Sequence, residues 1–101
     1  MTSEEKVGCR TPAEGREGVT NIAKWKFNLL RGAILASVQV AGAEGLRFSD
    51  LKEAVRPRLS EEELDTLGSL GWHVTTVKLE LEVRGELKRL AIKGPQRVVL
   101  G

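Results

Sequence analysis

Few side chains in this sequence have the chemistry that a catalytic or metal site requires. His73 is the single histidine and Cys9 the single cysteine, so no Cys or His pair has the spacing of metal ligands. A cysteine nucleophile also needs an activating base, usually a histidine, and the sequence around Cys9 offers none. We therefore expect no enzymatic activity, no cofactor and no small-molecule substrate.

Two short motifs look like ligand sites but have simpler explanations. The acidic run at residues 61–63 suggests a cation site, yet consecutive acidic side chains point in different directions, and a solvated helix start explains them. The stretch "GREG" at residues 15–18 lacks the Gly-Lys-Ser/Thr ending and the preceding strand of a phosphate-binding loop. Neither motif supports a site.

The charge distribution points to binding rather than catalysis. The chain has a net charge of +2, but residues 49–71 carry −3 and residues 72–101 carry +3. The basic end could meet an anionic polymer such as double-stranded DNA, or it could be an ordinary solvated surface. For the DNA interpretation, we expect contacts from two threonines on a helix and four cations on a hairpin: Thr75, Thr76, Lys88, Arg89, Lys93 and Arg97. The threonines could equally be structural residues at a helix start.

The elements that would position these residues can be inferred from hydrophobic spacing. Apolar residues recur every three or four positions from 23 to 41, which predicts a helix, and "GLRF" after it is short enough for a brief strand. Ser49 is expected to cap a second helix that ends near Arg56, because Pro57 disfavours helix in the preceding residue. Ser60 and Glu63 have the spacing of a capping box, so a short third helix should run to Gly68.

The stretch "TTVKLELEVRG", residues 75–85, has two interpretations. Apolar and charged residues alternate as in a half-buried strand, yet Val74, Val77 and Leu81 also share one face of a helix. Gly85 lies where a helix needs a left-handed cap, so we expect a helix over 72–84. "LKRLAI" and "RVVL", separated by "KGPQ", then predict a hairpin that turns at Gly94 and Pro95.

Two helices carry more apolar residues than one core can accept. On 72–84, a second apolar stripe lies opposite the first, and the helix over 23–41 has another. Together these stripes contain both tryptophans and form our expected interaction surface: Trp25, Leu29, Ala36, Val40, Trp72, Leu79 and Val83. Either the N-terminal arm folds back over them, or they bind a second copy or a protein partner, because an exposed apolar patch is a liability on a monomer.

The motifs "GREGVTNI", "GW" and "TTVKLELEVRG" resemble those of a small uncharacterised bacterial family, and "VTTVKLELEVRGELKR" resembles the last helix and first wing strand of winged helix-turn-helix proteins. The resemblance implies a mainly α fold with a small β hairpin, namely a winged helix-turn-helix domain over 21–101 preceded by a flexible arm over 1–20. It implies no reaction or ligand. Two features depart from a DNA-reading domain: an acidic insertion from Pro57 to Gly71, and a last helix without cations on its outer side.

Function and location follow from these expectations. We expect a DNA-associated or transcription-regulatory protein, or alternatively a protein interaction module that keeps the fold without binding DNA. No apolar run approaches the roughly 20 residues of a membrane span, and the first residues lack the order of a secretory signal. A single cysteine suits a reducing compartment, so we place the protein in the bacterial cytoplasm.

Overall fold

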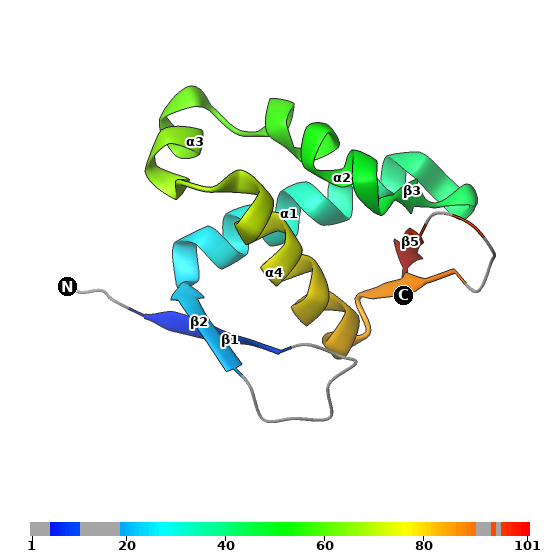
Figure 1. Ribbon diagram of the computed structural model, residues 1–101, viewed down its shortest axis with the longest axis horizontal. Coiled ribbons are helices and arrows are strands. Elements are labelled where there is room, and N and C mark those ends of the chain that lie inside the picture. The colour runs from blue at the N-terminus through cyan, green and yellow to red at the C-terminus, as the bar shows by residue number, and fades with distance from the viewer. Residues whose placement is uncertain (1–4, 11–18, 91–93, 95) are drawn as a thin grey trace.

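The computed structural model describes residues 5–10, 19–90, 94 and 96–101 (Figure 1). The elements follow one another as two strands, a long helix, a short strand, three helices and a C-terminal hairpin, with two short 3-10 helices in between. In chain order they are β1 (Lys6–Arg10), β2 (Val19–Ala23), α1 (Lys24–Ala41), η1 (Gly42–Glu44), β3 (Leu46–Arg47), α2 (Phe48–Val55), η2 (Arg56–Arg58), α3 (Glu61–Leu67), α4 (Leu70–Arg84), β4 (Leu87–Arg89) and β5 (Arg97–Leu100). The prediction of a mainly helical chain with a small amount of antiparallel sheet is confirmed.

The ambiguous stretch at residues 75–85 is helical, so the strand interpretation is wrong. It forms most of α4, which starts two residues earlier than expected because the Ser69 side chain accepts a hydrogen bond from the Trp72 amide. Gly85 ends the helix in the left-handed conformation, with φ of 82°, as the sequence predicted.

The capping expectations have opposite outcomes for the two short helices. At α3 the capping box is confirmed, with 3.0 Å from the Glu63 amide to Ser60 Oγ and 2.8 Å from the Ser60 amide to Glu63 Oε1. At α2 the expected Ser49 cap is wrong, since the helix begins at Phe48 without a side-chain cap. The Phe48 amide instead donates to the carbonyl of Gln96, 2.9 Å away, so the C-terminal hairpin satisfies this helix end.

A three-stranded antiparallel sheet joins the C-terminal hairpin to the chain between α1 and α2. Its strand order is β3-β5-β4, and Leu46 pairs with Val98 while Leu87 pairs with Leu100. Of the two strands predicted for the hairpin, "RVVL" is confirmed over its whole length and "LKRLAI" over Leu87–Arg89. Of the predicted turn, Gly94 has a positive φ of 95°, and Pro95 lies outside the described residues.

A second hairpin at the N-terminus was not expected. β1 pairs with β2 in antiparallel register, with Val7 opposite Ile22, and this pairing crosses the boundary that we placed at residue 20. The hairpin packs through Cys9 and Ile22, both buried, against the helical part of the fold. Isolated Val and Cys residues between glycines and charges gave too weak a two-residue period to reveal the strands.

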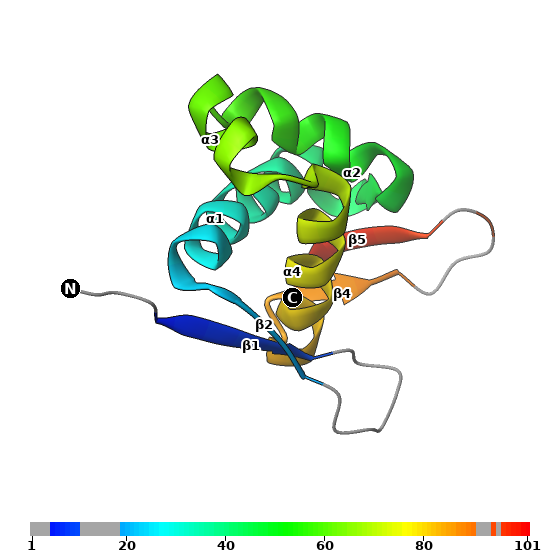
Figure 2. The ribbon, with the colours of Figure 1, turned by 60° about the vertical axis from the view of Figure 1, so that its left-hand side comes forward.

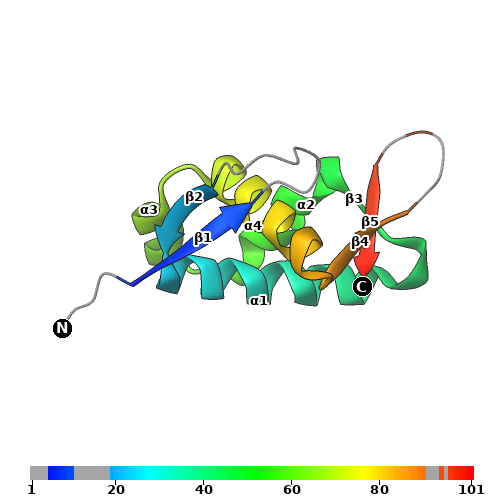
Figure 3. The same ribbon diagram turned by 90° about the horizontal axis from the view of Figure 1, so that it is seen from below.

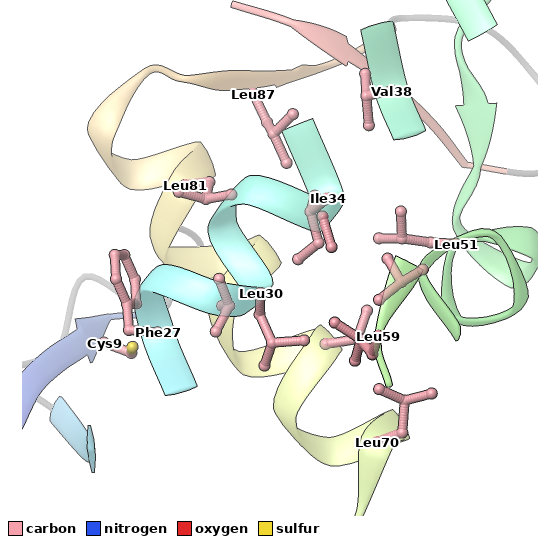
Figure 4. Close-up of a cluster of buried hydrophobic side chains, with 14 of the residues drawn as sticks. Cys9, Phe27, Leu30, Ile34, Val38, Leu51, Leu59, Leu70, Leu81 and Leu87 are labelled. Carbon is pink, nitrogen blue, oxygen red and sulfur yellow. The ribbon is translucent and has the colours of Figure 1, made fainter. Parts of the chain in front are cut away.

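Helices α1 and α4 cross each other, as the two rotated views show (Figures 2 and 3), and the core lies between them. Phe27, Leu30, Ile34 and Val38 line one face of α1 and are buried. Side chains from both N-terminal strands, α2, α3, α4 and both strands of the C-terminal hairpin complete the cluster together with Leu59, and Figure 4 shows most of it. At about 25 cal/mol per Å² of apolar area, this burial is the main stabilising contribution to the fold.

Gly45 provides a test of how closely the sheet approaches the end of α1. It has φ of 80°, and a Cβ there would lie 3.0 Å from the Val98 carbonyl oxygen and 3.1 Å from Leu90 Cδ1. We expect Gly45→Ala to lower the free energy of unfolding by about 1–3 kcal/mol for the backbone conformation, with a further loss from these contacts. Urea denaturation measures the difference.

Gly42→Ala is the matched control, because Gly42 has a similar φ of 73° and no described atom within 4 Å of a Cβ. It should show the conformational loss alone. Equal stability of the two variants would contradict the close approach at Gly45.

Candidate functional site

Helix α4 lies between the two hairpins of the molecule. It rests on α1 and α2, while β1 flanks its C-terminal half on one side and β4 on the other (Figures 1 and 3). This is the helix on which the sequence placed both the DNA-contacting threonines and part of the interaction surface. The orientation of each of its side chains therefore decides what the site can do.

The inner face of α4 is entirely apolar and buried. Leu70, Val74, Val77 and Leu81 follow the three- and four-residue spacing of one helix face, and all belong to the core. This is the first stripe that the sequence predicted.

The flank of α4 towards β4 and β5 carries a buried ion pair. Lys78 Nζ lies 2.5 Å from Glu82 Oε2, donates to Gln96 Oε1 at 2.6 Å, and lies 4.7 Å from the centre of the Phe48 ring. The Lys78 and Glu82 side chains are only 2% and 6% exposed. Glu82 Oε1 in turn accepts from Arg89 Nε at 2.8 Å, so one carboxylate holds a helix cation and a hairpin cation together.

Burial lowers the pKa of Lys78, because removal from water disfavours the charged ammonium. The hydrogen bond and the charge of Glu82 act in the opposite direction and favour the ammonium, while Arg89 adds a smaller lowering. The pair is thus stable only with both members present.

The opposite flank of α4 carries a second ion pair. Glu80 is fully buried and accepts from Arg84 Nε at 2.8 Å, and the Arg84 guanidinium lies 4.6 Å from the centre of the Phe27 ring on α1. Both cations of α4 therefore lie beside carboxylates and aromatic rings on its flanks.

The outer face of α4 is what remains between these flanks, and it bears no charged side chain. Trp72 is 48% exposed, and Thr75, Thr76, Leu79 and Val83 are half-buried. They lie within about 50° of one direction on the helix, opposite the core face. We call these five residues the outer α4 face.

The residues expected to contact DNA are only partly brought together. Thr75 and Thr76 lie on the outer α4 face, and Lys88 is exposed on β4. Arg89 is exposed but paired with Glu82, and half-buried Arg97 donates to the Gly45 carbonyl at 3.4 Å. Lys93 lies outside the described residues.

The residues expected to form one interaction surface divide into two sets. Trp72, Leu79 and Val83 belong to the outer α4 face, whereas the others lie on α1, away from it. These are Trp25, which is 45% exposed, Val40, which is 78% exposed, and half-buried Leu29 and Ala36. Both tryptophans stay about half exposed, so the described part of the arm does not cover them.

Sequence reasoning missed the pair of Lys78 and Glu82. Their spacing of four residues is the usual signal for an ion pair along a helix, but such pairs are normally solvated. Nothing in the linear sequence showed that Phe48 and Gln96 would bury it.

Comparison with known proteins gives a family but no activity. A model described as a family of unknown function, DUF6958, matches residues 6–98. The chain belongs to this family. No curated protein and no solved structure matches this chain. Membership agrees with the small family without assigned activity that the motifs suggested.

The described residues of this DUF6958 protein show neither a metal-binding cluster nor a membrane-spanning helix. They contain no group of three or more His, Cys, Asp or Glu side chains that could hold a metal ion. None of the helices in the described part combines the length and hydrophobicity that a membrane crossing needs.

The buried pair predicts a large loss of stability when only one partner is removed. Glu82→Gln leaves the Lys78 ammonium buried without its counter-charge, and we expect the free energy of unfolding to fall by about 3–5 kcal/mol. Urea denaturation followed by circular dichroism measures it. Glu53→Gln is the control, since the pair of Glu53 and Arg56 is largely exposed and its loss should change the free energy of unfolding little.

The lowered pKa of Lys78 predicts a pH dependence. The unfolded chain binds a proton at this lysine up to its ordinary value of 10.5, whereas the folded chain releases it at lower pH. Between these two values the unfolded state binds more protons, so the stability of the native protein should rise with pH relative to Lys78→Met. Parallel stability curves for the two proteins from pH 8 to about 10.5 would contradict the burial of this charge.

Proposed function

We propose that this protein is a winged helix-turn-helix domain that binds a protein partner through its outer α4 face. The order of elements supports the fold: α1, β3, α2, an inserted α3, α4 and the hairpin β4–β5, with β5 between β3 and β4. In such a domain α4 takes the place of the helix that enters the major groove, and β4–β5 takes the place of the wing.

The composition of the outer α4 face carries the proposal. Base recognition uses Arg, Lys, Asn or Gln side chains, and affinity for DNA comes from cations that meet phosphates. On α4 the cations Lys78 and Arg84 are instead paired with carboxylates on the flanks. The outer face offers an indole, two aliphatic side chains and two threonines, and exposed tryptophan with aliphatic neighbours is typical of the centre of a protein interface.

The inserted helix α3 adds to the same argument. It contacts α4 near its N-terminus, and its exposed side chains include Glu61, Glu62 and Asp65. Carboxylates at this end of the helix would repel a phosphate backbone. They do not hinder a protein partner, whose surface can provide cations opposite them.

DNA binding is the second candidate, and the exposed Lys88 on β4 favours it. In that case Arg89, Lys93 and Arg97 would join Lys88 on the phosphates, with Thr75 and Thr76 towards the bases. About four phosphate contacts would give a slope of roughly −3 to −4 for the logarithm of the binding constant against the logarithm of salt concentration. Lys88→Ala would then reduce the slope by about one.

Site-specific photo-cross-linking in cells separates the two candidates. A photoreactive amino acid at Leu79 should give a discrete adduct with another protein, because Leu79 is central on the outer α4 face. The same amino acid at Val40, which is 78% exposed on α1 and lies away from the outer α4 face, is the control and should not give that adduct. Trp72→Ala in the Leu79-labelled protein should reduce the adduct at least several-fold.

Nucleic-acid adducts from Leu79, together with salt-dependent binding to duplex DNA in fluorescence anisotropy, would overturn the proposal in favour of the second candidate. Absence of any adduct at Leu79 in cells that contain the labelled protein would also contradict it.

A further inference from the structure

The solvent side of α1 presents a row of uncharged residues at a regular spacing. The intervals alternate between three and four residues, the pattern by which one helix packs along another. The row comprises Trp25, Asn28, Gly32, Leu35, Gln39 and Gly42, of which Leu35 is half-buried and the others are exposed. We call it the α1 row.

An exposed helix face normally carries charges, and 30% of this chain is charged. Residues 32–43, however, include no charged residue. At Gln39 and Gly42 the α1 row borders a shallow hollow of about 200 Å³. The hollow is lined by Val38, Gln39, Gly42, Ala43, Val99 and Leu100. A partner helix can pack on a surface of this kind without burying an unpaired charge.

The charges at the two ends of α1 indicate which partner fits. Lys24, which pairs with Glu5 of the N-terminal hairpin region at 3.1 Å, and Lys26 lie at the start of α1, and its first turn contains no acidic residue, whereas its last turn contains no basic one. Exposed Glu44 lies three residues beyond its end, in η1. Both ends of the helix dipole are therefore uncompensated within α1, with cations at the positive end and a carboxylate at the negative end.

A second copy of the same helix in antiparallel orientation complements both ends. In this arrangement the lysines at the start of α1 in one copy lie near Glu44 and the C-terminal end of α1 in the other copy. A parallel copy would instead place like charges together. The row is also symmetric about its middle: Trp25 and Gly42, and likewise Asn28 and Gln39, lie at equal distances from the centre between Ala33 and Ile34. Gly32 beside this centre allows close approach, since no described atom lies within 4 Å of a Cβ there.

We propose that two copies of this chain form a symmetric dimer in which the α1 rows pack antiparallel. The dimer goes beyond the proposed function and does not depend on it. The α1 row lies on the side of α1 away from α4, so both outer α4 faces stay open in the dimer.

Sedimentation equilibrium of the full chain tests the association. The wild-type protein should show a concentration-dependent dimer, and Gly32→Glu should raise its dissociation constant on the order of a hundredfold or more, because it places two like charges at the centre. Glutamate is a better helix former than glycine, so the monomer should keep its fold, as circular dichroism can verify. Lys52→Glu, at an exposed position of α2, is the control and should leave the dimer unchanged.

Disulfide cross-linking tests the orientation. A mixture of Asn28→Cys and Gln39→Cys chains should form the mixed disulfide dimer, whereas each variant alone should form little, with the wild-type chain and its buried Cys9 as the control. A wild-type monomer at every concentration would overturn the dimer, and self-cross-linking of each single variant would overturn the antiparallel arrangement. The Leu79 adduct should persist in Gly32→Glu, so failure of the dimer and failure of the α4 proposal can be distinguished.

Discussion

The burial of Lys78 and Glu82 side by side on α4 is the constraint on which the surrounding arrangement depends. A buried ammonium is stable only with a counter-charge and hydrogen-bond acceptors around it. Glu82 supplies the first and Gln96 the second, while the Phe48 ring covers the site at 4.7 Å. These partners come from three separate parts of the chain. The contacts that stabilise the Lys78 ammonium therefore hold α4 against the start of α2 and the C-terminal hairpin.

The same constraint determines which charges remain for binding. Glu82 holds Arg89 of β4 at 2.8 Å in addition to Lys78, and Glu80 holds Arg84 on the other flank. Five charged side chains on or beside α4 thus pair with one another. In a DNA-binding winged helix-turn-helix domain, the helix in the place of α4 presents cations to the DNA. Here the outer face of this helix is uncharged because its charged residues pair with one another, and this pairing is the physical basis for proposing a protein partner.

The outer α4 face and the α1 row lie on opposite sides of the α1–α4 contact, because each helix uses its inner face for the core. Core packing consumes Phe27, Leu30 and Ile34 on α1 and Val77 and Leu81 on α4. What each helix presents outward is then set by its sequence at the intervening positions. A protein that pairs with a second copy through α1 would present two outer α4 faces pointing away from each other, an arrangement suited to joining two partners.

Local signals in the sequence determined the elements of this protein. The hydrophobic spacing of α1, the capping box of Ser60 and Glu63, and the left-handed cap at Gly85 depend on residues within one or two helical turns, so they can be inferred without the fold. The outer residues of α4 were likewise identified by their spacing. The start of α2 was misplaced because the acceptor for its first amide is the Gln96 carbonyl, 48 positions away in the chain.

Only the tertiary structure decided how the charges are used. Whether Lys78, Arg89 and Arg97 are available to a ligand depends on Glu82, Gln96 and Gly45 being brought beside them, and on how much water the folded chain excludes. The N-terminal hairpin likewise exists because α1 and α4 together offer a surface for Cys9 and Ile22, which neither strand could bury alone. Residue spacing along a chain determines which face a side chain occupies, whereas burial and ion pairing depend on what packs against that face.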